Sequence, residues 1–142
     1  MSDAAAISGR LEGGTHVLPV RIYWEDTDAG GVVYHASFVR FMERGRTELL
    51  RALGVDQGLL VAETGITFVV RRMEIDFLRV GQIDDVLHIE TAVKRLGGAS
   101  LTLDQRVTRG GEAVASAVVT VVAIRDHRPV RIPDAVRGLF AR

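Results

Sequence analysis

Only one segment of this sequence has the period of an amphipathic helix, and it stands among strand-like segments. Residues 37–53 place apolar side chains on one helical face and mainly charged ones on the other. The strand-like segments, rich in β-branched or aromatic residues, are 16–24, 66–80, 85–97, 99–109 and 112–124. One helix cannot cover two faces of a sheet. The sequence therefore predicts an α+β fold in which a curved antiparallel β-sheet wraps around one long central helix.

Two Gly-Gly pairs separate the last three strand-like segments. Gly97-Gly98 precedes residues 99–109, and Gly110-Gly111 follows them. Such pairs are typical of tight turns between antiparallel strands, so we expect two consecutive hairpins. Pro19 interrupts the first strand-like segment, which favours a place for it at a sheet edge or a strand start.

The helix itself carries three position-specific signals. Gly45 lies on the apolar face, where glycine costs about 1 kcal/mol relative to alanine, so we expect the helix backbone to approach the sheet closely there. Ser37 is expected to cap the start of the helix. Gly54 stands where the C′ residue of a helix belongs.

The composition narrows the classes of function. Lys and Arg together number 18, as do Asp and Glu, so the formal net charge is zero. This balance gives no indication of nucleic-acid binding and favours self-association. The chain has no cysteine, which excludes disulfides, thiol catalysis and cysteine-bound zinc. Its longest apolar stretch, residues 113–124, is too short to cross a bilayer, and its start does not resemble a signal peptide. We therefore expect a cytoplasmic protein.

The length of 142 residues predicts a single domain. We assign residues 16–142 to that domain and expect residues 1–15 to be a disordered tail. The segment from Pro133 to Arg142 is expected to contain one short helix.

The segment 25–35, EDTDAGGVVYH, concentrates three acidic residues before two glycines. It lacks the ligand spacing of an EF-hand loop. The histidines at 16, 35, 88 and 127 show no zinc-binding spacing, so no metal site is expected. Glu25 and Asp26 are expected to be solvated or to pair at a strand end. Asp28 can form an Asx-turn before the glycines or supply a reactive carboxylate.

The longer stretch 21–50, RIYWEDTDAGGVVYHASFVRFMERGRTELL, is more specific than a glycine-rich loop. It resembles the 4-hydroxybenzoyl-CoA thioesterase family of hot-dog-fold acyl-CoA thioesterases, and within that family the Tol–Pal-associated (YbgC-like) group. The motif positions are Arg21, Thr27, Asp28, Gly31, Val32 and Val33. Residues 68–80 and 84–101 also resemble strands of the family, and the resemblance extends over about residues 16–125.

The resemblance implies hydrolysis of an acyl-CoA thioester. Asp28 is then the general base or the nucleophile, which the sequence cannot distinguish. The backbone amide of His35 is implied as a donor to the oxyanion, and a helix N-terminus favours negative charge on physical grounds. The His35 side chain either positions water or the leaving group, or only forms a hydrogen bond near the helix start. Tyr34 is expected to shape the pocket, and no cofactor is implied.

Coenzyme A carries phosphates that suit basic side chains and glycine amides. The resemblance implies that Arg71 and Arg72, at strand ends, and Lys94, Arg95, Gly97 and Ser100, around a turn, contact it. Solvated charges on a plain hairpin are the alternative. Gly65 is expected to line the acyl pocket and to offer an amide. Glu43 and Glu48 match the helix glutamate of another hot-dog branch, but a surface ion pair is the favoured role for both.

The resemblance also implies a homodimer or homotetramer with active sites between subunits. Protein partners in the cell envelope or in lipid metabolism are a further expectation. Two alternatives remain: a hot-dog dehydratase acting on 3-hydroxyacyl thioesters, and a non-catalytic module that binds acyl-CoA or a protein partner.

Overall fold

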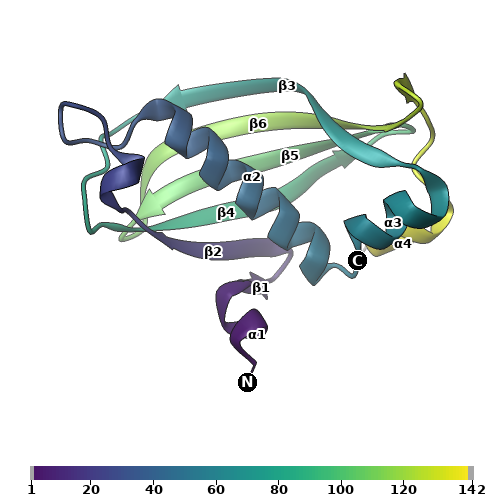
Figure 1. The fold of residues 1–142 in the computed structure, drawn as a ribbon, viewed down its shortest axis with the longest axis horizontal. Coiled ribbons are helices and arrows are strands. Elements are labelled where there is room, and N and C mark those ends of the chain that lie inside the picture. The colour runs from purple at the N-terminus through teal and green to yellow at the C-terminus, as the bar shows by residue number, and fades with distance from the viewer. Residues whose placement is uncertain (1, 141–142) are drawn as a thin grey trace.

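The predicted central helix, α2, lies across one face of a single antiparallel sheet that curves around it (Figure 1). The structure is a computed structural model and describes residues 2–140. The sheet has the order β1-β2-β4-β5-β6-β3, and β7 pairs with β6. The elements are α1 (Asp3–Ile7), β1 (Arg10–Glu12), β2 (Thr15–Arg21), the 3₁₀ turn η1 (Trp24–Asp26), α2 (His35–Ala52), α3 (Gln57–Thr64), β3 (Thr67–Phe77), β4 (Val86–Leu96), β5 (Ser100–Arg109), β6 (Glu112–Arg125), β7 (Arg128–Pro129) and α4 (Asp134–Phe140).

Helix α2 begins two residues earlier than the sequence predicts. Its N-cap is Tyr34, so the prediction that Ser37 caps the helix is wrong. Ser37 is buried inside the first turn, and its hydroxyl donates to the carbonyl oxygen of Asp26 over 3.0 Å. Gly54 has a φ of 97° just after the helix, which confirms it as the C′ residue.

The apolar face of α2 is buried against the sheet, and Gly45 sits at the closest approach. Phe41, Met42 and Leu49 are at most 1% exposed, and burying such a side chain contributes about 1.5–3 kcal/mol. A Cβ atom on Gly45 would lie 2.7 Å from Ile89 Cγ2 and 2.8 Å from Thr91 Oγ1. The expected close approach of helix and sheet at this glycine is therefore confirmed.

Both predicted Gly-Gly turns join hairpins: Gly97-Gly98 links β4 to β5, and Gly110-Gly111 links β5 to β6. A third such pair, Gly13-Gly14, joins β1 to β2, so Arg10 pairs with Val17. Residues 2–15 are thus structured, where the sequence predicts disorder. The Gly13-Gly14 pair is the same turn signal as the two predicted pairs, but the strand β1 before it has three residues, too few to show a strand pattern in the sequence. Met1 lies outside the described residues.

Helix α3 was not predicted, because its apolar side chains have little helical periodicity. Helix α4 falls inside the segment 133–142 that was expected to hold a helix, and residues 141–142 lie outside the described part of the chain. On its outer side, β2 pairs with β1 only as far as Val17, so at Pro19 it has no outer neighbour among residues 2–140. This position suits proline, which has no N–H to donate to a neighbouring strand.

Strand β3 is the other edge of the sheet. No strand within residues 2–140 pairs with its outer side. Val69, Val70 and Phe77 on this strand are 40%, 47% and 49% exposed, respectively. An edge strand with exposed apolar side chains is a ready template for pairing with another chain.

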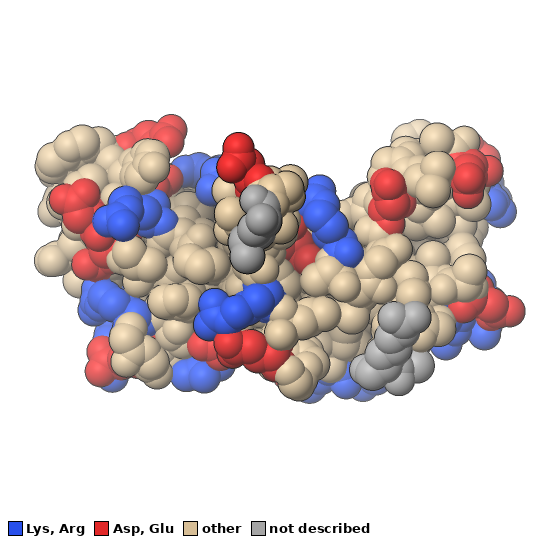
Figure 2. Space-filling view, turned by 90° about the horizontal axis from the view of Figure 1, so that it is seen from below, with Lys and Arg blue, Asp and Glu red and all other residues tan. Residues whose placement is uncertain are grey.

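The molecular surface carries both signs of charge. On the face shown in Figure 2, acidic and basic side chains are interspersed and form no continuous patch of one sign. None of the helices in residues 2–140 combines the length and apolar character needed to span a membrane.

Candidate active site

The acidic segment folds as a small closed loop directly before α2. The Tyr34 N–H donates to the Asp26 carbonyl over 2.9 Å, and the Asp28 N–H donates to the Val32 carbonyl over 2.9 Å. Thr27 and Val33 form the bridge between these two bonds. The chain therefore turns back on itself at the glycines, and the closed loop leads directly into the start of the helix.

The three acids of this loop have different environments. Asp26 is 8% exposed, and its Oδ2 accepts the Tyr23 N–H over 2.8 Å. The prediction that Asp26 is solvated is therefore wrong, because its carboxylate caps the 3₁₀ turn and its carbonyl closes the loop. Glu25 is exposed, in agreement with the sequence prediction.

Asp28 uses its two carboxylate oxygens differently. Oδ1 accepts the Gly30 N–H over 2.8 Å, which is the Asx-turn that the sequence allowed. Asp28 is exposed, and no hydrogen bond from residues 2–140 to Oδ2 is present. The turn thus orients the side chain and leaves one oxygen free to accept a proton or to attack a carbonyl carbon.

His35 is the first residue of α2, so its backbone N–H has no acceptor within the helix. Its exposed ring lies 4.4 Å from the Tyr34 ring and 5.9 Å from the Phe77 ring, measured between centroids. Phe38 also contacts Phe77 at 5.9 Å. Phe77, at the end of β3, was not among the predicted site residues, because nothing in sequence connects it to a loop about 45 residues earlier.

The turn before β4 is hydrogen-bonded to this loop. Val33 donates its N–H to the Gly81 carbonyl over 2.8 Å, and Val32 forms a bridge with Gln82. Asp85 closes the turn by accepting the Gln82 N–H at 2.9 Å and Arg109 Nη1 at 2.8 Å. Desolvation would raise the pKa of Asp85, but the Gln82 N–H and the Arg109 guanidinium together lower it.

The residues predicted to bind coenzyme A do not lie beside Asp28 in the same chain. Arg71 and Arg72 lie in the middle of β3, not at a strand end, and Arg72 pairs with Glu74. Lys94 and Arg95 end β4, at the opposite end of the sheet from the acidic loop. The pairings of Thr67 with Ile124 and of Ser100 with Val122 define that end, which also holds Gly65, Gly97 and Ser100.

Two of these predicted donors are already engaged. The Gly65 N–H donates to the Val61 carbonyl over 2.9 Å as the C-cap of α3, so this amide is not free as predicted. Gly97 donates to the Ser100 carbonyl over 2.8 Å, and its own carbonyl accepts Arg137 Nη1 over 2.7 Å. The side chains of Lys94 and Arg95 are exposed, and Lys94 pairs with Asp104 at 4.0 Å.

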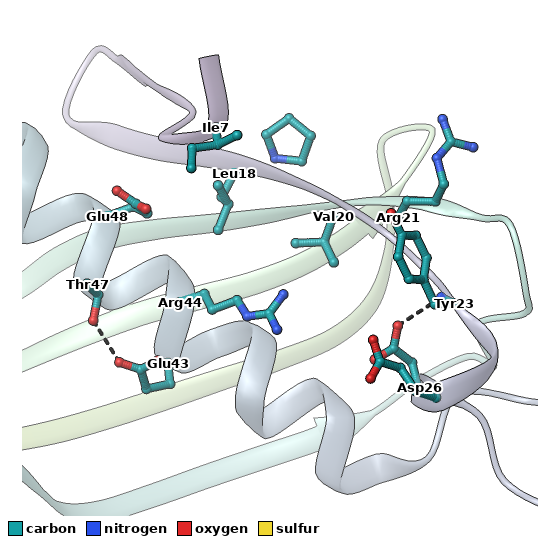
Figure 3. A pocket seen from close by; sticks show the side chains of 12 residues that line it. Ile7, Leu18, Val20, Arg21, Tyr23, Asp26, Glu43, Arg44, Thr47 and Glu48 are labelled. Carbon is teal, nitrogen blue, oxygen red and sulfur yellow. Dashed lines mark hydrogen bonds between the residues drawn. The ribbon is translucent and has the colours of Figure 1, made fainter. Parts of the chain in front are cut away.

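A groove of about 630 Å³ runs between the polar face of α2 and β2, with Ile7 of α1 at one side (Figure 3). Glu43, Arg44 and Glu48 line it, but Asp28 and His35 do not. Glu43 accepts the Thr47 hydroxyl over 2.7 Å, and Glu48 pairs with Arg51 at 2.7 Å. These local contacts agree with the surface roles favoured for both glutamates.

A smaller cavity of about 130 Å³ lies on the other side of α2, against β3, β5 and β6. Arg46 lines it and is only 8% exposed. Burial lowers the pKa of the Arg46 guanidinium, while the Glu43 carboxylate acts in the opposite direction. Sequence reasoning missed Arg46, since its partner Gln105 is 59 residues away. Within residues 2–140, no three His, Asp or Glu side chains gather as a metal-ligand set.

The curved antiparallel sheet around α2, with a carboxylate loop at the helix start, defines a hot-dog thioesterase fold. Comparisons with known proteins agree. The model of the thioesterase-like superfamily matches residues 22–140. The acyl-CoA thioesterase YbgC of Haemophilus influenzae is 43% identical over 125 residues, covering 87% of this chain and 92% of that protein. The chain therefore belongs to the thioesterase-like superfamily, and the resemblance to YbgC-like proteins is confirmed.

Solved structures give the same result. A probable thioesterase from Bartonella henselae matches with a TM-score of 0.80 at 41% identity, covering 84% of this chain and 99% of that one. A 4-hydroxybenzoyl CoA thioesterase mutant, complexed with 4-hydroxybenzoyl CoA, matches with a TM-score of 0.84 and covers 89% of this chain and 99% of that one. Because its identity is 21%, this second likeness concerns the fold alone.

Proposed function

We propose that this protein hydrolyses acyl-CoA thioesters with Asp28 as the catalytic carboxylate. The observation that carries the proposal is the exposed Asp28 carboxylate, with Oδ2 free, in a closed loop that leads directly into the first turn of α2. Membership of the superfamily and similarity to proteins named acyl-CoA thioesterases support it.

The chemistry needs one attacking group and one oxyanion donor. As a general base, Asp28 takes a proton from water while the water oxygen bonds to the thioester carbonyl carbon. The carbonyl oxygen then carries the negative charge, which the His35 N–H and the helix N-terminus stabilise. Collapse breaks the carbon–sulfur bond and releases coenzyme A, which takes up the proton. As a nucleophile, Asp28 would instead form an anhydride that water later cleaves.

We also propose that two chains pair along β3 around a two-fold axis, which makes the strands antiparallel. The start of each β3 then faces the end of the partner's β3. This arrangement covers the exposed apolar edge. It also brings the acidic loop of one chain to the end of the sheet that holds Lys94 and Arg95 in the other. This pairing is supported by the position of the acidic loop and of Lys94 and Arg95 at opposite ends of the sheet within one chain.

Replacing Asp28 with asparagine tests the catalytic assignment cleanly. Asparagine can still accept the Gly30 N–H, so Asp28→Asn preserves the Asx-turn. We expect the rate of free-thiol release from acyl-CoA to fall by about 100-fold or more, with an unchanged melting temperature. Glu25→Gln, in the same loop, serves as the matched control and should stay within about twofold, as surface substitutions do.

Near-wild-type turnover by Asp28→Asn would refute the role of this carboxylate. If wild-type protein bound acyl-CoA without releasing thiol, the non-catalytic alternative would replace the enzyme. The cytoplasmic location and the protein partners in the cell envelope or lipid metabolism stay predictions.

A further inference from the structure

Arg46 is a buried charge without an ionic partner in its own chain. Its side chain is 8% exposed, and it makes no ion pair with Asp or Glu among residues 2–140. Nη1 donates to Gln105 Oε1 over 3.0 Å. The Gln105 amide nitrogen in turn donates to the Met42 carbonyl at 2.8 Å and to Thr91 Oγ1 at 2.9 Å. This network fixes one edge of the guanidinium.

The other edge of the guanidinium is open. Among the described residues, His16 Nδ1 is the one fully enclosed side-chain nitrogen or oxygen without a hydrogen-bond partner. The Arg46 nitrogens beyond Nη1 are therefore not sealed in the core, and Arg46 is one of the residues that line the cavity. Phe68, Val70, Leu101 and Val121 form apolar walls of this cavity. Its polar lining, besides Arg46, consists of Glu43, Thr47 and Gln57.

The position of the cavity follows from the dimer, so this inference rests on the proposed function. Phe68 and Val70 belong to the first half of β3. In a two-fold β3 pair this half lies opposite the end of the partner's β3, where Phe77 contacts His35 within each chain. The cavity therefore lies beside the partner's Asp28, where the acyl chain of a bound thioester would extend away from the reacting carbonyl.

We propose that Arg46 binds a carboxylate at the far end of the acyl group, so that the preferred substrates are CoA thioesters of dicarboxylic acids. The planar guanidinium matches a carboxylate with paired hydrogen bonds. A buried charge without a partner is costly, and the carboxylate supplies the missing one. Glu43 also lines this cavity and acts on the Arg46 charge at longer range, but it forms no ion pair with Arg46 among residues 2–140, and its exposed carboxylate accepts the Thr47 hydroxyl. The apolar walls accommodate the methylene chain.

The test compares thioesters matched in length. Wild-type kcat/KM is measured for glutaryl-CoA against pentanoyl-CoA and for adipoyl-CoA against hexanoyl-CoA. We expect the acid-ended member of at least one pair to be favoured about tenfold or more. Arg46→Gln should lower kcat/KM for that substrate by about 10–100-fold and leave its aliphatic match within about threefold, as loss of one charged contact predicts. Arg44→Gln, on the groove side of α2, should leave the ratio unchanged.

Three outcomes would overturn the proposed role of Arg46. Equal losses on both members of a pair would make Arg46 a structural residue and overturn the inference. A wild-type preference for the aliphatic members would also overturn it, and this measurement needs no variant, so it holds even if Arg46→Gln does not fold. In both cases the hydrolysis of aliphatic thioesters leaves the proposed function standing. No cleavage of any thioester would overturn the proposed function and this inference together.

Discussion

Asp26 and Asp28 are two residues apart, but their carboxylates differ in burial and in hydrogen bonding. The Asp26 carboxylate is buried and holds the Tyr23 N–H, whereas the Asp28 carboxylate is exposed with one oxygen free. They differ in the local bonds they make, because Asp26 Oδ2 accepts the Tyr23 N–H of the 3₁₀ turn whereas Asp28 Oδ1 accepts the Gly30 N–H of the Asx-turn. One acid therefore builds the site, and the other is available for chemistry.

The His35 N–H can be removed without breaking the helix. His35 is the first residue of α2, and proline is well tolerated there. Tyr34 has a φ of −65° and a ψ of 135°, which suits a residue before proline. We expect His35→Pro to lower kcat by about 10²–10³-fold through loss of the oxyanion donor.

His35→Phe is the matched control for this experiment. It keeps an aromatic ring against Tyr34 and Phe77 as well as the backbone N–H. Its kcat should fall by less than about tenfold, well short of the loss expected for the amide. Equal losses in His35→Phe and His35→Pro would assign the catalytic contribution to the imidazole instead, because both variants lack it. Circular dichroism of both variants would verify that α2 is intact.

Residue-level prediction from the sequence succeeded where the signal is local. Gly45 and Gly54 follow from helical period and capping rules alone. Arg46 and Asp26 could not be predicted, since their environments depend on Gln105 and on closure of the loop, respectively. Burial of a charged side chain is a tertiary property that helical period does not report.

Among the elements, the hairpins were predictable because two adjacent glycines between strand-like runs leave few other conformations. Strand β1 and helix α3 were not predicted, each for a different reason. Strand β1 is only three residues long, and α3 has eight residues without a clear apolar face. Helix α3 buries no residue; its ends are set by local caps, the Asp56 side chain accepting the Leu59 N–H and Gly65 at the C-cap.

The turn at residues 82–85 should make stability depend on pH. The pKa of Asp85 is lowered in the folded protein, so its ionised form stabilises the fold above its unfolded-state pKa of roughly 3.9. That contribution is lost as the pH falls through the lower folded-state value. We expect Asp85→Asn to reduce the free energy of unfolding by about 1 kcal/mol at pH 7. The difference from wild type should shrink towards pH 3.

Urea unfolding at pH 7 and at pH 3 measures this difference. Asp84→Asn is the control, because Asp84 has a φ of 70°, a conformation that asparagine also adopts readily. Its effect should be near zero at both pH values. An Asp85→Asn penalty that stays constant between pH 7 and pH 3 would show that the carboxylate charge is not the stabilising group.

At the scale of the whole molecule, the two halves of the predicted site lie at opposite ends of the sheet. The acidic loop and the start of α2 are at one end, and Lys94, Arg95 and the start of β3 are at the other (Figure 1). The sequence motif predicted each half as a segment. It could not show their separation, because strand direction and register become known only when the sheet is assembled.

We propose that each active site combines Asp28 of one chain with the Lys94–Arg95 end of another. Two differently tagged chains allow heterodimers of defined composition to be purified. In the trans heterodimer, one chain carries Asp28→Asn and the other carries Lys94→Glu with Arg95→Glu. In the cis heterodimer, one chain carries all three substitutions and the other is wild type.

Thiol release by these two heterodimers, at acyl-CoA concentrations below KM, is the decisive measurement. If sites are shared, the trans heterodimer has one intact site and keeps about half of the wild-type activity, while every site of the cis heterodimer is damaged and it is nearly inactive. The reverse order, with an active cis heterodimer and an inactive trans heterodimer, would contradict the shared site and place each active site within a single chain.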